Sequence, residues 1–235
     1  MDERVRDRRG ERGGQLRKPS VNGAAARIFD IACSAAGLVL LLPLFLALAI
    51  AILIDDGRPV FFGQMRIGRD GRPFRIWKFR TMRAASKGSM ITASGDSRVT
   101  RSGTALRKWK LDELPQLFNV LAGHMSLVGP RPEVPQYVEP ESPTWKAVLR
   151  VRPGITDLAS LMFRHEEKLL GSAQDPEAFY REAVLPAKLQ LNLSYLGSRS
   201  FTQDLRLILL TIRYSLFPKG FDAARIRRVF ERSRT

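Results

Sequence analysis

The longest apolar stretch of the chain runs from Ile31 to Ile54 and contains no charged residue. Its 24 residues exceed the roughly 20 that an α-helix needs to cross the hydrocarbon core of a bilayer. The stretch lies too far from the N-terminus and is too long for a signal peptide, and no small-residue cleavage site follows it. The pattern therefore predicts a membrane segment attached to a large polar part of the chain.

Pro43 lies in the middle of this stretch and should bend or break the helix. Arginine and lysine are abundant on both sides of it, whereas a spanning helix normally has a basic excess only on its cytoplasmic side. A re-entrant helix–break–helix accounts for the basic residues on both sides, because both flanks then lie on the cytoplasmic side of the membrane. A kinked spanning helix is the alternative, since proline is tolerated in membrane helices.

The rest of the pattern predicts a mainly helical, α+β domain with one short β-hairpin. Alternating β-branched and aromatic residues within 59–82, on either side of Asp70–Gly71, predict the hairpin. The small, polar residues 84–104 predict a long loop. Helical spacing predicts one helix over 176–197, interrupted at Pro186, a strongly apolar one over 201–217 in the core or the membrane interface, and an amphipathic one whose apolar face comprises Leu111, Leu114, Leu117, Phe118 and Leu121.

The charge balance narrows the choice of partners. The chain has 39 basic and 23 acidic residues, a net charge of +16, which favours nucleic acid, a phosphate-rich ligand or an anionic membrane surface. A single cysteine excludes an intrachain disulfide, and with only two histidines it argues against a structural zinc site. The sequence contains no recognisable nucleic-acid-binding motif, so no nucleic-acid partner is expected.

Asp112 and Glu113 form an acid pair that follows a run of cations in "RKWKLDELPQL". Pro115 is accepted only in the first turn of a helix, which predicts Asp112 at or next to the N-cap. There the helix dipole and the nearby cations should keep Asp112 ionised. One interpretation is a capped helix with solvated acids. The other is metal-assisted phosphoryl transfer, because Mg²⁺ binds through one or two carboxylates plus substrate phosphates and an aspartate can attack phosphorus.

Four blocks of the sequence, in this order, resemble a known family: "RIFDIACSAAGLVLLLPLFLALAI", "PVFFGQMRIGRDGRPFRIWKFRTM", "LDELPQLFNVLAGHMSLVGPRP" and "VRPGIT". They are similar to the bacterial sugar transferases that prime glycan assembly, the monotopic polyprenyl-phosphate phosphoglycosyl transferases. The resemblance runs from about Arg27 to Phe217 and fits the small form without additional N-terminal spanning helices. It implies transfer of a sugar-1-phosphate from a nucleotide sugar, typically a UDP-sugar, to undecaprenyl phosphate, with release of the nucleoside monophosphate.

The resemblance also implies roles for individual residues. Asp112 is the expected nucleophile, which takes the phosphosugar covalently, and Glu113 helps to hold Mg²⁺. Pro43 is the expected break in a re-entrant membrane helix. The expected ligands of the diphosphate and the polyprenyl phosphate are Lys78, Arg107 and Arg131, with Arg80 and Arg152 as further candidates.

Composition and the resemblance together predict four segments: a disordered basic tail (1–22), a re-entrant membrane segment (23–56), a catalytic domain (57–217) and a basic C-terminal segment (218–235). The resemblance implies a position on the cytoplasmic face of the bacterial inner membrane, and the positive charge favours contact with anionic lipid. A homodimer is left open. The rival functions are a lipid-surface or nucleic-acid binding protein, suggested by charge alone, and a catalytically silent membrane scaffold.

Two positions depart from the family pattern. His124 stands where an acidic residue is usual, and Asp157–Ser160 replaces the common Gly-Trp-Ala-Gln after "RPGIT". We expect residues 157–167 to tune which sugar or nucleotide is accepted.

Overall fold

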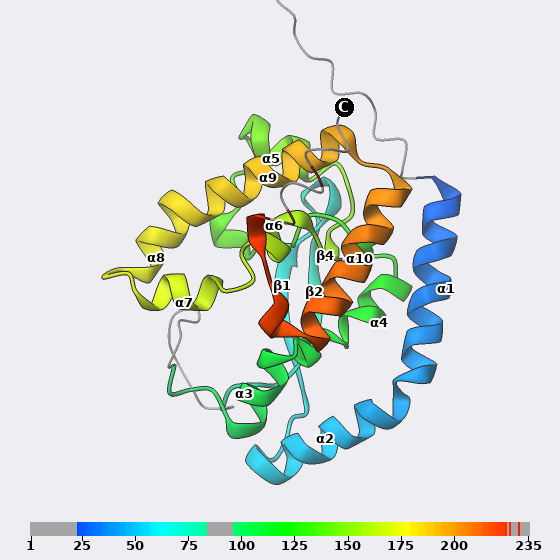
Figure 1. Cartoon of the computed structure of the whole chain (residues 1–235), viewed down its shortest axis with the longest axis vertical. Helices are drawn as coiled ribbons and strands as arrows, with labels where there is room; N and C mark the ends of the chain where they lie inside the picture. Colours follow the sequence, from blue (N-terminus) through cyan, green and yellow to red (C-terminus); the bar gives the residue numbers. More distant parts are fainter. Residues whose placement is uncertain (1–22, 84–95, 225, 227–229, 231–235) are drawn as a thin grey trace, which may run out of the picture.

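A computed structural model describes residues 23–83, 96–224, 226 and 230. The chain is mainly helical, with a two-stranded antiparallel sheet and a two-stranded parallel sheet. Figure 1 shows a bent pair of helices, α1 and α2, forming an arm along one side and the lower end of the molecule, with the hairpin in the centre and α7 to α9 on the opposite side. The predicted basic tail, residues 1–22, lies outside the described residues.

The long apolar stretch forms two helices, α1 (Ala24–Leu40) and α2 (Leu42–Asp56), bent by 61° at Leu41. Pro43 lies in the first turn of α2, where its missing N–H costs no intrahelical bond, so the predicted break is confirmed. Among the described residues no single helix is long and apolar enough to cross a membrane, whereas the bent pair meets the criteria together.

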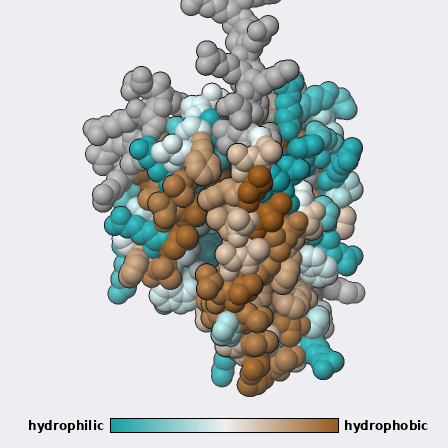
Figure 2. Space-filling view, turned by 90° about the vertical axis from the view of Figure 1, so that its right-hand side faces the viewer, coloured by the Kyte–Doolittle hydropathy of each residue, from teal (hydrophilic) through white to brown (hydrophobic). Residues whose placement is uncertain are grey.

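The outer faces of α1 and α2 are strongly apolar, and Figure 2 shows them as a continuous hydrophobic surface that reaches the lower end of the molecule. The exposed residues of this surface include Val39, Leu40, Leu42, Leu46, Ile50 and Ile54.

Two charged side chains fasten the start of α1 to the rest of the molecule. The Arg27 guanidinium donates to the carbonyls of Val120, Leu121 and Met125, and Asp30 accepts a hydrogen bond from the Leu127 amide at 3.1 Å. The charged start of α1 therefore binds the rest of the domain, although the sequence analysis assigned it to the membrane segment 23–56.

The predicted hairpin is confirmed as β1 (Phe61–Ile67) paired antiparallel with β2 (Pro73–Phe79). The turn contains Asp70 and Gly71, whose φ angles of 58° and 74° lie in the left-handed region that these residue types tolerate. A second, parallel pair, β3 (Ser126–Val128) and β4 (Gly154–Thr156), was not predicted.

Helix α3 (Arg101–Lys108) begins inside the region predicted as a loop, so the prediction of a loop as far as residue 104 was wrong. Thr100 caps this helix, because its hydroxyl oxygen accepts a hydrogen bond from the Gly103 amide at 3.0 Å. Gly103 lets the helix lie against the Thr81 backbone, where any side chain would collide with the Thr81 carbonyl. Residues 84–95 of the predicted loop lie outside the described residues.

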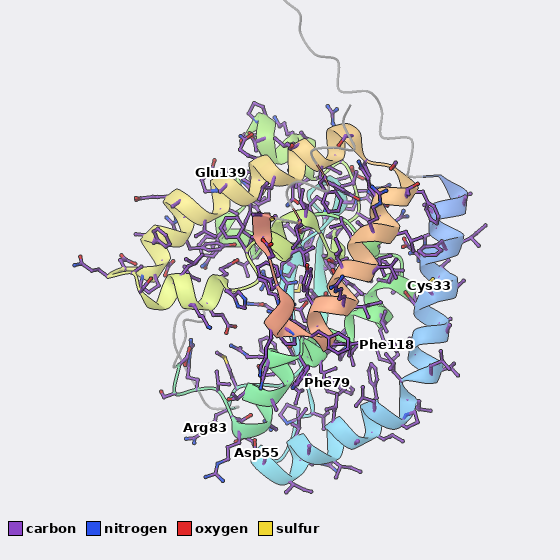
Figure 3. All side chains as sticks on the ribbon, in the orientation of Figure 1. Cys33, Asp55, Phe79, Arg83, Phe118 and Glu139 are labelled. Atoms are coloured by element: carbon purple, nitrogen blue, oxygen red, sulfur yellow. The ribbon has the colours of Figure 1, made fainter. Side chains whose placement is uncertain are left out.

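The predicted amphipathic helix is shorter than expected, because α4 covers only Gln116–Leu121. Asn119 on its inner face binds the edge of β2, accepting from the Trp77 amide at 3.0 Å and donating to the Arg75 carbonyl at 2.7 Å. The residues buried on α4 are Gln116, Asn119 and Val120, whereas Phe118 is 47 % exposed. The predicted apolar face lies toward the bent helices, where Leu111 and Leu114 pack against the core cluster that includes Phe45 and Phe79. The Phe118 ring lies 6.1 Å from that of Phe45 on α2, and Figure 3 shows Phe118 and Phe79 on the side of the hairpin toward these helices.

The C-terminal half is helical, and its longest helix packs against both parallel strands. Its elements are α5 (Pro143–Val148), α6 (Leu158–Met162), α7 (Glu166–Gly171), α8 (Pro176–Phe179), a π-helical turn η5 (Tyr180–Val184), α9 (Leu185–Ser198) and α10 (Phe201–Leu216). The predicted helices over 176–197 and 201–217 are confirmed, the first with its irregularity just before Pro186. Ile226 and Phe230, from the predicted basic C-terminal segment, are buried against α10 residues such as Leu207 and Tyr214.

Candidate active site

The acid pair lies in a single 3₁₀ turn, η3 (Leu111–Glu113), between α3 and α4. Lys110 adopts a left-handed conformation (φ 56°) that separates the turn from α3. Pro115 has no amide hydrogen to bond back to the Leu111 carbonyl, which instead accepts from the Leu114 amide at 3.2 Å. The prediction that Asp112 caps an α-helix was therefore wrong: α4 begins only at Gln116, and Asp112 is held in the tighter turn before it.

Glu113 is clamped between two cations that come from other parts of the chain. Lys78 on β2 places its ammonium 3.1 Å from Oε1. Arg131, in the segment after β3, donates to both carboxylate oxygens, with Nη1 at 3.0 Å from Oε2. Such bidentate, charge-assisted pairing fixes the Glu113 carboxylate firmly. The structure thus brings together four residues singled out in the sequence: Lys78, Asp112, Glu113 and Arg131.

Asp157 holds Arg131 in place through the backbone. One oxygen of its buried carboxylate accepts from the Arg131 amide at 2.5 Å, and the other accepts from the Ser160 amide and so caps α6. Asp157 does not line the cavity described below, so the structure gives this departure from the family pattern a positioning role. His124, the other departure, is exposed and stacks on the Phe74 ring.

The two neighbouring carboxyls have opposite electrostatic environments. Burial, reinforced by the charge of Glu113, raises the pKa of Asp112. Burial by itself would also raise the pKa of Glu113, but Arg131 and Lys78 lower it well below its usual range. Lys78, Lys110 and Arg107 lower the pKa of Asp112, as the sequence predicts, but burial and the charge of Glu113 outweigh them, so the net shift is upward. Lys78 and Arg131 pair with Glu113, and Asp112 has no α-helix N-terminus beside it.

Asp112 and Glu113 line a cavity of about 920 Å³. One wall is apolar and comes from the bend between α1 and α2 together with α4 and α10: Leu41, Leu44, Leu117, Ile212 and Leu216. Cations flank the acid pair: Lys78, Arg107, Lys110 and Arg131. A further wall carries charged side chains and two tyrosines: Arg66, Glu133, Glu166, Lys188, Tyr137 and Tyr180. Of these, only Glu166 belongs to the segment 157–167 that the sequence analysis connects with donor choice. Glu133 could have been suspected, because it follows Arg131 by two residues in "GPRPE", but nothing in the sequence marks Lys188 or Tyr180.

The remaining predicted cations differ in position. Arg107 lines the cavity, and its guanidinium donates to the Thr81 hydroxyl at 3.0 Å and to Glu167 at 3.3 Å. Arg80 is buried away from the cavity and donates to the carbonyls of Asp56, Gly57 and Arg58 at the end of α2. Arg152 donates to the Gly123 carbonyl and lines a separate small cavity beside Arg27. The structure thus places Arg80 and Arg152 outside the site, where they bind backbone.

Two carboxylates side by side are the feature that would hold a divalent cation. Asp112 is 7 % exposed, and its Oδ1 has no hydrogen-bond partner among the described residues. Those residues contain no group of three or more His, Cys, Asp or Glu side chains that would bind a metal unaided. A pair of acids fits Mg²⁺, which completes its coordination with water and substrate phosphates. Because Glu113 is already paired with Lys78 and Arg131, the unpartnered Asp112 oxygen is the more available ligand.

Comparison with known proteins identifies relatives over most of the chain. The family model of bacterial sugar transferases matches residues 21–218. A UDP-glucose:undecaprenyl-phosphate glucose-1-phosphate transferase of Caulobacter vibrioides is 36% identical over 205 residues, covering 85% of this chain and 72% of the relative. An exopolysaccharide production protein of Rhizobium leguminosarum bv. phaseoli is also 36% identical over 205 residues, covering 83% and 97%.

Some relatives are much longer than this chain. A UDP-N-acetylgalactosamine-undecaprenyl-phosphate N-acetylgalactosaminephosphotransferase of Aeromonas hydrophila is 36% identical over 215 residues, which cover 89% of this chain but only 47% of the relative. The region matched by the family model, residues 21–218, contains the bent helices, the acid pair and the residues that line the cavity. The chain belongs to the bacterial sugar transferase family, a family of transferases, which confirms the resemblance seen in its sequence.

Proposed function

We propose that this protein transfers a sugar-1-phosphate from a UDP-sugar to undecaprenyl phosphate through a covalent intermediate on Asp112, as a first membrane step of bacterial glycan synthesis. The observation that carries the proposal is the position of Asp112: buried, with one unpartnered oxygen, in a cavity between a cation cluster and the apolar bend of α1 and α2. The relatives' names supply the substrate classes.

The first step joins Asp112 to the sugar phosphate. Arg131, Lys78 and Arg107 neutralise the donor's diphosphate, and the Asp112 carboxylate attacks the phosphorus that carries the sugar. The bond from that phosphorus to the bridging oxygen breaks, and UMP leaves with the electron pair. Asp112 must be ionised to attack, and a pKa raised by burial makes its carboxylate a stronger nucleophile than a solvated one.

The second step releases the product. A phosphate oxygen of undecaprenyl phosphate attacks the same phosphorus, the aspartyl–phosphorus bond breaks, and undecaprenyl-diphosphate-sugar forms while the Asp112 carboxylate is restored. Asp112 and Glu113 would hold Mg²⁺ together with the phosphates, and the ion would supply charge neutralisation at the transferred group. Glu113 is held in position for this by Lys78 and Arg131.

We also propose that α1 and α2 form a re-entrant anchor on the cytoplasmic face of the inner membrane. The exposed apolar residues of both helices support this placement, as do the basic flanks, which suit anionic lipid. Exposed apolar residues on α10, Leu205, Leu209, Ile212 and Leu216, support its position in the interface. The isoprenoid chain would then enter along the apolar wall, while its phosphate meets the cations beside Asp112.

A donor panel tests the proposed reaction. Purified protein with Mg²⁺, undecaprenyl phosphate and a set of UDP-sugars should release UMP with at least one donor. Asp112→Asn should lower the rate of release by about 10³-fold or more, whereas the matched change Asp70→Asn, at the exposed hairpin turn, should leave it unchanged. Absence of UMP with every donor, or full activity of Asp112→Asn, would refute the mechanism.

A further inference from the structure

A cluster of buried charges forms the wall of the cavity beyond Arg131. The Glu133 carboxylate accepts a hydrogen bond from the Tyr180 hydroxyl at 2.6 Å. The Lys188 ammonium donates to Glu166 at 3.0 Å and lies 3.9 Å from Glu133. Glu133 and Lys188 are less than 10 % exposed, yet both line the cavity. The mechanism proposed above makes no use of these groups.

The charges in this cluster have unused hydrogen-bonding capacity. A lysine ammonium has three donors and a carboxylate has about four acceptor positions. Among the described residues, Lys188 makes one hydrogen bond, and the guanidinium of Arg66 is 3.6 Å from Glu133, too far for a good hydrogen bond. Buried charges that serve only packing are usually fully hydrogen-bonded, because burying them is costly. Spare donors and acceptors on a cavity wall instead suit a polar ligand.

An irregular turn in the helix positions two members of this cluster. A regular α-helix rotates about 100° per residue, so Tyr180 and Lys188, eight residues apart, would diverge by about 80°. The π-helical turn η5 accommodates one extra residue, which brings the pair to within about 20°, as for residues seven apart. The Lys188 ammonium accordingly lies 5.2 Å from the centre of the Tyr180 ring. Pro186 favours this turn, because it has no amide hydrogen to bond to the Glu182 carbonyl.

The cluster also lies at a fixed separation from the phosphate-binding group. Only Pro132 separates Arg131 from Glu133, so their Cα atoms are at most about 7 Å apart. A sugar whose phosphate is bound by Arg131 would therefore present its hydroxyls near Glu133. Carboxylates accept from sugar hydroxyls and an ammonium donates to them, so alternating acids and a base match a polyhydroxylated ring.

We infer that Glu133, Glu166 and Lys188 form a subsite that binds the hydroxyl groups of the donor sugar and so sets donor preference. The inference rests on the proposed function, which supplies the sugar phosphate at Arg131. It assigns specificity to residues on three separate segments, the "GPRPE" loop, α7 and α9. Two buried apolar residues, Val134 and Leu170, line the same cavity, and apolar neighbours strengthen hydrogen bonds to charged groups.

Two variants test the subsite. Glu166→Gln keeps the shape of a side chain that is 25% exposed and removes its charge, and Lys188→Met removes the ammonium. A matched surface pair serves as control: Lys146→Met and Glu141→Gln, which break an exposed ion pair on and next to α5. For each protein, kcat/KM is measured with UDP-glucose, UDP-galactose and their N-acetylated counterparts, the inhibition constant is measured with UDP, and Tm is recorded.

The inference predicts unequal losses. For at least one donor, kcat/KM should fall by about 10- to 100-fold, because a charged hydrogen bond to one of its sugar hydroxyls is lost. For another donor, kcat/KM should fall much less. The inhibition constant of UDP, which has no sugar, should stay within about twofold, and the control variants should match the wild type. If Lys188→Met has a low Tm, the folded Glu166→Gln protein still gives the answer.

Other results overturn the inference in distinguishable ways. Equal losses of kcat/KM for all donors, together with a weaker affinity for UDP, would mean that the cluster binds the nucleotide or only stabilises the fold. Unchanged kcat/KM for every donor in both variants would mean that the cluster contributes only to packing. Inactivity of the wild-type protein with every donor would instead refute the proposed function, and the inference with it.

Discussion

At the residue scale, the site depends on how a few charges are paired. The sequence predicted that Lys78, Asp112, Glu113 and Arg131 act together, and the structure places them in one cavity wall. It did not predict the pairing, in which Glu113 takes both cations and Asp112 keeps an unpartnered oxygen. Arginines that bind backbone, such as Arg80, look the same in sequence as arginines that face a cavity, because only the fold determines what a guanidinium meets.

Asp112→Asn should stabilise the fold while abolishing turnover. A folded-state pKa raised above the unfolded value means that, at pH values above both, the ionised carboxylate destabilises the native state. Removing the charge should therefore raise the free energy of unfolding at pH 7. Activity should fall about 10³-fold or more. Thermal unfolding at pH 7 and at pH 4 tests this, because the gain should shrink at the lower pH, and a lower Tm at pH 7 would contradict it.

Glu113→Gln should move the acid limb of the pH–rate profile to lower pH. Asp112 has its pKa raised by burial and then by the negative charge of Glu113, so activity should be lost as pH falls through that raised value. Removing the Glu113 charge, which also frees Arg131 and Lys78 to act on Asp112, should lower the pKa of Asp112. The shift is measured from the pH dependence of kcat/KM for the residual activity of the variant. An acid limb that moves to higher pH would contradict the proposal that it reports the pKa of Asp112.

At the element scale, sequence patterns located the elements better than their ends and faces. The break at Pro43, the hairpin around Asp70–Gly71 and the helix at 201–216 follow from local chemistry. The orientation of α4 does not follow from local chemistry, because Asn119 faces inward to form hydrogen bonds with backbone groups of β2. The short parallel strands β3 and β4 have little local signal, since their pairing is made by segments about 28 residues apart in the chain.

Asn119→Leu should destabilise the domain. It would leave the Trp77 amide and the Arg75 carbonyl without their side-chain partners, and a buried polar group without a partner costs about 1–3 kcal/mol. Denaturant unfolding in detergent measures the loss. Gln190→Leu, which removes an exposed amide on α9, serves as the control, and equal stability of the two variants would show that Asn119 does not fasten α4 to β2.

The bend of α1 and α2 predicts that both ends of the pair lie on one side of the membrane. In a Cys33→Ser background, single cysteines at Ser20 and Asp70 should react with an impermeant maleimide from the same, cytoplasmic side. Inside-out and right-side-out vesicles give the comparison. Labelling of the two positions from opposite sides would mean that the pair spans the membrane as a kinked helix.

At the scale of the whole molecule, the cavity joins an apolar bend to a charged interior. The wall formed by α2, α4 and α10 suits an isoprenoid, the cations around Asp112 suit phosphates, and the cluster at Glu133 suits a sugar. The net charge of +16 pointed only to an anionic partner. Which cations face the cavity, and in what order, depends on contacts between segments far apart in the chain. The homodimer stays a prediction, which the mass of the detergent-solubilised protein would test.

The mass of the intact protein tests the covalent mechanism most directly. The protein is incubated with Mg²⁺ and a UDP-sugar that it accepts as a donor, in the absence of undecaprenyl phosphate. The covalent mechanism predicts a mass increase equal to one sugar phosphate, located on Asp112 by peptide mapping, with release of one equivalent of UMP. Addition of undecaprenyl phosphate should then remove the added mass. An unmodified protein that releases UMP only when both substrates are present would contradict the covalent mechanism, because transfer would then be direct.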